Sequence, residues 1–170
     1  MGWLIFIVVV VAAWIMSSQE INSKIRTDEG YPKIDLTIVK CDNAPQGIEA
    51  ILSCNKDELM VNANGFVKVV QNEDIIDITV ESAKSIVNNP QFSFGKAIAG
   101  VALLGGVGAV AGLAGKNKDK DLQMLVVSYM KNDTIEHMVF LQQYGKDYTV
   151  KTESNLLNKV KNDILEVISG

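Results

Sequence analysis

Two uncharged apolar blocks constrain the fold of this chain more than any other feature of its sequence. Trp3 to Met16 and Ala97 to Ala114 contain no charged residue, whereas the remainder is polar and charged. Apolar stretches of this length are buried in a protein core or in a lipid bilayer. The 170 residues leave room for one domain beside such a segment, but they are too few for two ordinary domains.

The first block predicts a transmembrane anchor over residues 1–18. As a helix, the uncharged stretch from Gly2 to Ser18 is about 25 Å long, which just crosses a thin bilayer. Trp3 and Trp14 stand near its ends, where indole rings favour the membrane interface. A cleaved signal peptide is the alternative. No basic residue precedes Trp3, however, and the best cleavage site, after Ala13, lies inside the apolar run.

Basic residues after the anchor set the predicted orientation. Lys24, Arg26 and Lys33 follow the apolar run, so the positive-inside rule places the C-terminal domain in the cytoplasm and the N-terminus outside. The cytoplasm keeps thiols reduced. We therefore expect Cys41 and Cys54 to be free, buried thiols, although a secreted chain could pair them.

Residues 19–33 are polar and lack periodicity, which indicates a tether, and residues 34–170 are interpreted as one β-rich domain. Runs of alternating apolar and polar residues predict strands over 34–38, 48–54, 59–61, 66–70, 75–80, 122–130 and 135–141, with Tyr148 and Val150 in a further short strand. The segment Lys131-Asn-Asp-Thr134 predicts a hairpin turn. Short strands at this spacing favour a small antiparallel barrel or sandwich.

The last segment changes to a helical period. Its apolar residues are Leu156, Leu157, Val160, Ile164, Leu165 and Ile168. Ser154 is the expected cap, and Lys159 and Asp163 stand four apart on the outer face. We expect an amphipathic helix that plugs the open end of a curled sheet.

A glycine-rich insertion over residues 93–116 interrupts the predicted domain. Small residues recur four apart at Gly95/Ala99, Ala102/Gly106, Gly105/Ala109, Gly108/Gly112 and Ala111/Gly115. Such ridges let another helix approach closely, which predicts a glycine-zipper contact through Gly95, Gly100, Gly105, Gly108, Gly112 and Gly115. We favour a helical hairpin that breaks at Gly105-Gly106 and contacts a membrane or a partner. Packing on the domain itself and a full membrane span are the alternatives.

The sequence predicts no catalytic, cofactor or metal site. Gly106-Val-Gly108-Ala-Val-Ala111 matches a dinucleotide fingerprint, but no strand precedes it and no βαβ pattern surrounds it. Lys116 is followed by Asn117 and not by Ser or Thr, which excludes a phosphate loop. His137 is the only histidine and is expected to be structural or solvated, because two distant cysteines do not complete a zinc site. A net charge of −4 argues against nucleic-acid binding.

The acidic groups Asp57/Glu58 and Glu73/Asp74/Asp77 fall in or beside predicted turns. We interpret them as solvated turn residues, with a weak cation site as the alternative.

Residues 46–168 resemble a group of small bacterial proteins with a pleckstrin-homology-like (PH-like, GRAM-like) domain and a glycine-rich insertion. The matching features are the strand run from Ile51 to Asn62, the block from Lys96 to Lys116, the paired strands and the terminal helix. The resemblance implies a seven-stranded barrel capped by a helix and used for binding, not catalysis. PH domains that bind phosphoinositides carry a basic cluster in the first hairpin, whereas the turn here, Asn55-Lys56-Asp57-Glu58, is net acidic.

Together these features predict an α+β chain: a transmembrane helix, a PH-like β domain with a glycine-rich helical insertion, and a C-terminal amphipathic helix. The expected function is a non-enzymatic, membrane-tethered binding or scaffolding module at the cytoplasmic face, whose partners are the bilayer, other proteins and further copies of itself. The alternative is a small membrane-active protein, toxin-like or of the phage-exclusion type, whose glycine zipper oligomerises or perturbs the bilayer.

Overall fold

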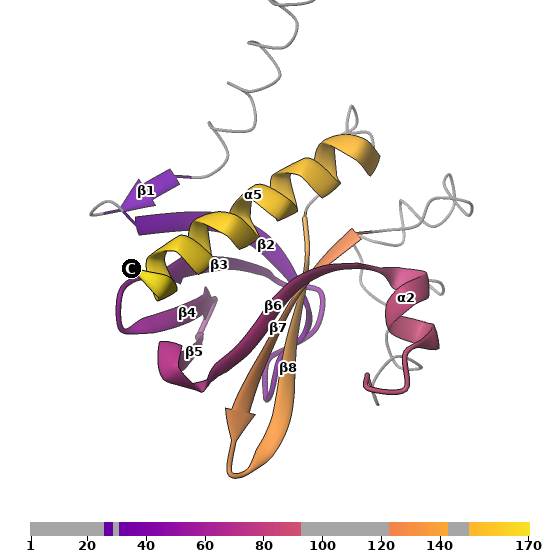
Figure 1. Ribbon diagram of the computed structural model, residues 1–170, viewed down its shortest axis with the longest axis horizontal. Coiled ribbons are helices and arrows are strands. Elements are labelled where there is room, and N and C mark those ends of the chain that lie inside the picture. Colours follow the sequence, from indigo (N-terminus) through magenta and orange to yellow (C-terminus); the bar gives the residue numbers. More distant parts are fainter. Residues whose placement is uncertain (1–25, 29–30, 93–122, 143–149) are drawn as a thin grey trace, which may run out of the picture.

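The structure, a computed structural model, describes residues 26–28, 31–92, 123–142 and 150–170 (Figure 1). Its elements in chain order are β1 (Arg26–Asp28), β2 (Tyr31–Lys40), β3 (Glu49–Cys54), β4 (Glu58–Ala63), β5 (Phe66–Gln71), the 3-10 helix η1 (Asn72–Asp74), β6 (Ile75–Ser82), α2 (Ala83–Asn88), β7 (Gln123–Lys131), β8 (Thr134–Leu141) and α5 (Val150–Ser169).

All of these strands belong to one antiparallel sheet. Seven of them follow the order β5-β4-β3-β2-β8-β7-β6, and β1 pairs with the beginning of β2. The consecutive strands β2 to β5 form one meander and β6 to β8 form another, and the two are joined where the end of β2 pairs with β8. Within the described residues β5 and β6 do not pair, so the sheet is open.

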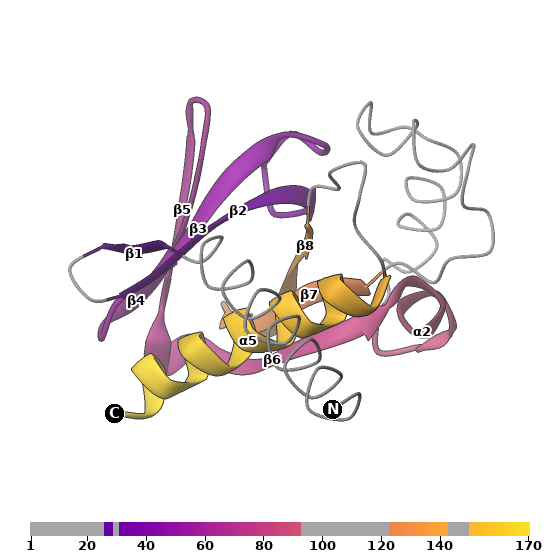
Figure 2. The same cartoon turned by 90° about the horizontal axis from the view of Figure 1, so that it is seen from above.

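The main core lies between the inner face of this sheet and α5. Alternation along the strands directs every second side chain inward, where these side chains form one cluster with Leu156, Leu157, Val160 and Ile164 of α5. The helix packs against β2, β6 and β7, and in both views it crosses the inner side of the curved sheet (Figures 1 and 2). The apolar face of α5 therefore connects the two meanders.

A second, smaller cluster lies on the outer face of β2, β7 and β8. It consists of Val39, Ile86, Met124, Val126, Val139 and Leu141, with Ala83 and Phe92 packed against it. The short helix α2 covers this cluster at the end of β6 (Figure 1). The four residues from Met124 to Val127 are all buried, because β7 is covered on both faces at this point.

The prediction of a small barrel or sandwich is wrong. The strands form one open sheet, not a closed barrel or a two-sheet sandwich, and the helices of the described part are α2 and α5 with the 3-10 helix η1. The sheet also begins before the predicted start at Ile34, since β1 and the first residues of β2 fall within residues 19–33. Val150 is the first residue of α5 and not part of a strand, so Ser154 lies inside the helix and does not cap it.

The single-pass membrane arrangement, with its outside N-terminus and cytoplasmic domain, also requires correction. Among the described residues, no helix is both long enough and apolar enough to cross a bilayer. The predicted anchor over residues 1–18, with Trp3 and Trp14, lies outside the described residues, as does the glycine-rich insertion.

Other local predictions are confirmed. Cys41 and Cys54 are free and buried. Lys159 Nζ lies 2.9 Å from Asp163 Oδ2 on the outer side of α5.

We predict that Leu157→Ala lowers the free energy of unfolding by about 2–5 kcal/mol, because it leaves a cavity beneath α5. Leu157 is 0% exposed and packs in the main cluster. Leu165→Ala is the matched control, since Leu165 lies on the same helix and is 39% exposed; its expected cost is about 0.5 kcal/mol. Urea unfolding followed by circular dichroism measures both. Equal losses would mean that the helix does not hold the core as described.

Candidate functional site

The β7–β8 hairpin carries a group of associated polar side chains. Asn132 and Asp133 form its turn with positive φ angles of 49° and 61°, the geometry of a type I′ turn. The register places Ser128 opposite His137 and Tyr129 opposite Glu136. Because side chains alternate between the faces, Ser128 and His137 lie on the outer face of the hairpin and Tyr129 and Glu136 on the inner face.

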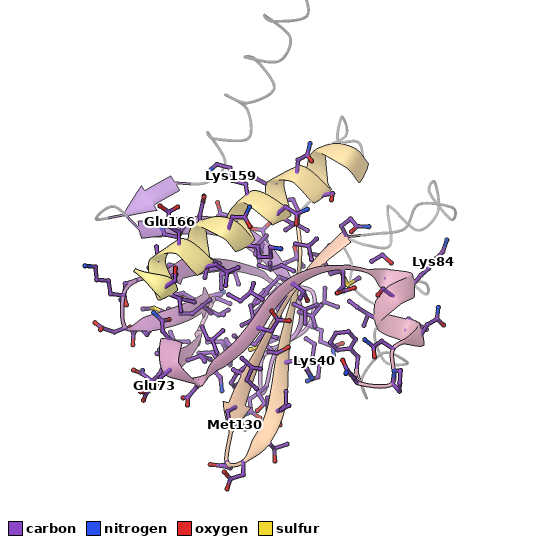
Figure 3. The ribbon with its side chains drawn as sticks, viewed as in Figure 1. Lys40, Glu73, Lys84, Met130, Lys159 and Glu166 are labelled. Carbon is purple, nitrogen blue, oxygen red and sulfur yellow. The ribbon has the colours of Figure 1, made fainter. Side chains whose placement is uncertain are left out.

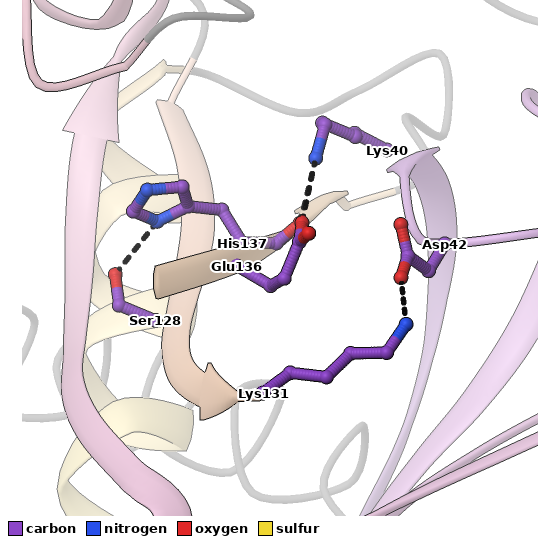
Figure 4. A network of polar contacts seen from close by, with 6 residues as sticks. All are labelled: Lys40, Asp42, Ser128, Lys131, Glu136 and His137. Carbon is purple, nitrogen blue, oxygen red and sulfur yellow. Dashed lines mark hydrogen bonds and ion pairs between the residues drawn. The ribbon is translucent and has the colours of Figure 1, made fainter. Parts of the chain in front are cut away.

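Two ion pairs join the hairpin to the end of β2 (Figure 4). Lys131 Nζ donates a hydrogen bond to Asp42 Oδ2, and Lys40 Nζ lies 3.9 Å from Glu136 Oε2. Lys40 also donates to the carbonyl oxygen of His137 at 3.3 Å. The hydrogen bond lowers the pKa of Asp42 and raises that of Lys131. All four charged side chains are partly exposed, so solvent screens the pairs and their role is to position the hairpin.

The inner side of the hairpin is closed by an aromatic ring and a lysine. Tyr129 is buried, and Lys68 Nζ from β5 lies 5.0 Å from the centre of its ring. Burial raises the pKa of the Tyr129 hydroxyl, which has no hydrogen-bond partner among the described residues. Burial likewise raises the pKa of the nearby Cys41 thiol to about 11, although Lys68 partly offsets this effect. At neutral pH Cys41 is therefore a protonated thiol and a poor nucleophile.

A serine–histidine pair lies on the outer side of the hairpin. Ser128 Oγ is 2.9 Å from His137 Nδ1, and the His137 ring meets the edge of Phe92 with ring centres 5.3 Å apart. A hydrolytic triad also needs a carboxylate on the second ring nitrogen. Glu136 is adjacent to His137 in β8 and so points to the other face, while Asp77 of β6 pairs with Ser128 from the side opposite His137. In the described part of the chain this pair is a structural contact.

The outer face of the hairpin is a continuous strip that is covered at only one end. Its successive cross-strand pairs are Met124/Leu141, Val126/Val139, Ser128/His137 and Met130/Ile135. The first two pairs are buried in the second cluster, and Phe92 lies against the third. The fourth pair is uncovered: Met130 is 41% exposed and Ile135 is 53% exposed. Figure 3 shows Met130 close to the tip of the hairpin.

A third large apolar side chain is exposed on the neighbouring strand. Ile76 is 49% exposed and lies in a bulge of β6, between residues that pair with Tyr129 and Ser128 of β7. Ile76, Met130 and Ile135 are here called the tip patch. Sequence reasoning did not find the tip patch, although apolar residues next to a predicted hairpin turn were a usable signal.

The site residues that the sequence predicted are not brought together in the described residues. Gly95, Gly100, Gly105, Gly108, Gly112 and Gly115 lie outside them, as do Trp3 and Trp14. Within the described ranges, no group of three His, Cys, Asp or Glu side chains is placed to hold a metal ion.

The acidic residues Asp57 and Glu73 are exposed, the first in the β3–β4 turn and the second in η1. The backbone N–H of Asp57 donates to Asn55 Oδ1 at 2.8 Å, which explains this turn without a bound cation.

In comparisons with known proteins, no family model matches the chain and no curated protein matches it at a significant level.

We predict that His137 titrates below its usual value of 6.5. Burial is the largest cause and Lys40 adds to it, whereas Glu136 acts in the opposite direction. Because the folded-state pKa is the lower one, neutral His137 stabilises the fold above about pH 6.5, and this contribution is lost as the pH falls through the folded pKa. The chain has one histidine, so NMR of its imidazole measures the pKa without ambiguity.

Two variants check the sign of these charge effects. Lys40→Gln should raise the pKa of His137, and Glu136→Gln should lower it further, because each removes one of the neighbouring charges. A wild-type midpoint at or above 6.5, or shifts of the same sign in both variants, would contradict this account of the site.

Proposed function

We propose that this chain is a non-enzymatic binding module that assembles with a protein partner through the tip patch. The proposal is carried by one observation: the Met130/Ile135 pair is uncovered at the end of a strip whose other apolar pairs are buried. Large apolar side chains that cluster on a surface and are rimmed by polar groups are typical of protein interfaces. Methionine is also enriched in such interfaces, while charged residues are depleted from their centres.

The surroundings of the tip patch favour a preorganised binding surface. The type I′ turn fixes the backbone of the hairpin, and the ion pairs to Asp42 and Lys40 hold its inner side against the end of β2. A partner that binds a rigid surface does not have to order it, so less binding free energy is lost. Ser128, His137 and Asp77 lie on the same outer face beside the tip patch and supply its polar rim.

The chemistry of the neighbouring groups supports binding over catalysis. His137 and Ser128 contact each other on the outer face while Glu136 is directed to the inner face, and the raised pKa of Cys41 keeps its thiol protonated. These groups stabilise the hairpin and leave its outer surface to the partner.

We further propose that the domain is related to PH-like domains through its strand order, with an open sheet in place of their closed barrel. This is supported by the two meanders of four and three strands, by their connection through β2 and β8, and by the helix α5 that follows the last strand and packs on the inner face. In the described residues no observation favours the alternative of a membrane-active protein, because the glycine residues on which it depends lie elsewhere in the chain.

We expect Ile135→Lys to weaken the partner complex at least about tenfold, since it places a charge within the tip patch. Val87→Lys is the control: Val87 is also exposed, at 37%, but it lies on α2. The tagged full-length variants are expressed in cells that make the partner, and crosslinked complexes are quantified by mass spectrometry. The proposal requires a protein that is lost with Ile135→Lys and kept with Val87→Lys. Equal recovery with both variants would refute it.

A further inference from the structure

The strand β5 has one edge with which no other described strand pairs. It lies at the end of the sheet, pairs with β4 along its whole length, and pairs with no other strand of the described part. Figure 2 shows the turn between β4 and β5 projecting away from α5 and β6. An edge strand of this kind presents backbone N–H and C=O groups that can pair with another strand.

The register of the β4–β5 hairpin shows which residues face that edge. Asn64 and Gly65 form a two-residue turn, with Gly65 at a φ of 75°, and Ala63 pairs with Phe66. A turn of this length closes on a hydrogen-bonded pair, and such pairs then alternate along an antiparallel ladder. Val67, Val69 and Gln71 therefore direct their backbone groups away from β4.

The same residues form an uncharged outer surface. Val67 is 60% exposed and Val69 is 40% exposed, and Val69 stands opposite Met60 of β4 on the same face. Natural proteins usually protect an open edge with proline, a bulge or a charged side chain. β5 has no proline, its pairing with β4 is regular, and its one charged residue is Lys68, an inward-pointing lysine of the kind that can protect an edge. Here, however, the Lys68 ammonium is already placed over the Tyr129 ring inside the domain, so pairing at the edge does not displace it.

We propose that this edge is a self-association site, at which β5 pairs with β5 of a second copy about a two-fold axis. A strand paired with itself about such an axis is antiparallel and self-complementary. With the axis at Val69, Val69 stands opposite Val69 of the second copy and Val67 stands opposite its Gln71. This register also places Lys68 opposite Val70, whereas an axis at Lys68 would set two lysines against each other, which is destabilising.

The second copy fits better than an unrelated strand because both sides of the contact then have the same uncharged outer residues. Met60, Val67 and Val69 of the two copies would form one apolar surface across the joined sheets. A contact of one short strand is small by the standard of permanent dimers, so the association is reversible and depends on concentration. It does not involve the tip patch and is independent of the function proposed above.

Substitutions at Val69 test the site. Val69→Pro removes an N–H that faces the open edge and is not used in the β4 ladder, and proline is tolerated at such edges. Val69→Thr is the control, because it keeps both the N–H and the branched side chain. Sedimentation of the full chain over a range of concentrations should show a dimer that Val69→Pro weakens at least about tenfold and Val69→Thr preserves. Circular dichroism verifies that both variants keep the fold.

A disulfide test remains informative if Val69→Pro fails to fold. In the proposed register, two copies of Val69→Cys bring their Cα atoms to about 5.5 Å, within the range that a disulfide bridges. Two copies of Gln71→Cys stay about 13 Å apart along the strand and cannot be bridged. Oxidation should therefore crosslink Val69→Cys but not Gln71→Cys, and the wild type controls for Cys41 and Cys54. Three results would overturn the proposal: a wild-type chain that stays monomeric, a dimer that a folded Val69→Pro variant forms as tightly as the wild type, or equal crosslinking of both cysteine variants.

Discussion

The burial of one face of α5 is the interaction on which the rest of the structure depends. The sheet is open, so its inner face would expose two meanders of apolar side chains if no other element covered it. Leu156, Leu157, Val160 and Ile164 fill that space and contact residues from both meanders. Hydrophobic stabilisation is proportional to the apolar area removed from water, so the burial of this helix face stabilises the joined sheet.

The outer face of the sheet is covered along only part of its length. Between Met124 and Val127 both faces of β7 are covered, one by the main core and one by α2. Toward the turn the cover on the outer face ends at Phe92, and the strip continues as exposed apolar residues. The same strand is thus a core element at one end and a surface at the other, and its backbone is anchored by the buried end. The tip patch therefore continues directly from a strand segment that is held on both faces.

Local pattern predicted the strands, the hairpin and the terminal helix because each depends on neighbours in the sequence. Alternation placed β3 to β8 close to their observed bounds, and the turn at Asn132 and Asp133 was recognised from residue type. The helix α2 was missed because it is only 6 residues long, although Ser82, which accepts a hydrogen bond from the Ser85 N–H, was a usable capping signal.

What depends on distant residues could not be predicted in this way. Lys131 and Asp42 are 89 positions apart, and no local pattern pairs them. Whether β5 and β6 close a barrel is likewise decided by sheet curvature and not by the sequence of either strand. The tip patch lies between these cases. Its residues, and the strand face on which they lie, could be seen in the sequence, but their exposure depends on how far the cover by α2 and Phe92 extends along the hairpin.

The bulge in β2 connects the two apolar clusters with the charged residues of the hairpin. Ile34, Leu36 and Ile38 face the main cluster, and so does Cys41, which a regular strand would place on the opposite face from Ile38. The shift in pairing between Ile38 and Lys40 explains the change. Val39 keeps the outward direction that alternation from Ile38 gives it and enters the second cluster, while Lys40 and Asp42 are directed at the hairpin. A single extra residue in the central strand therefore serves both cores and positions the charges that hold the proposed binding surface.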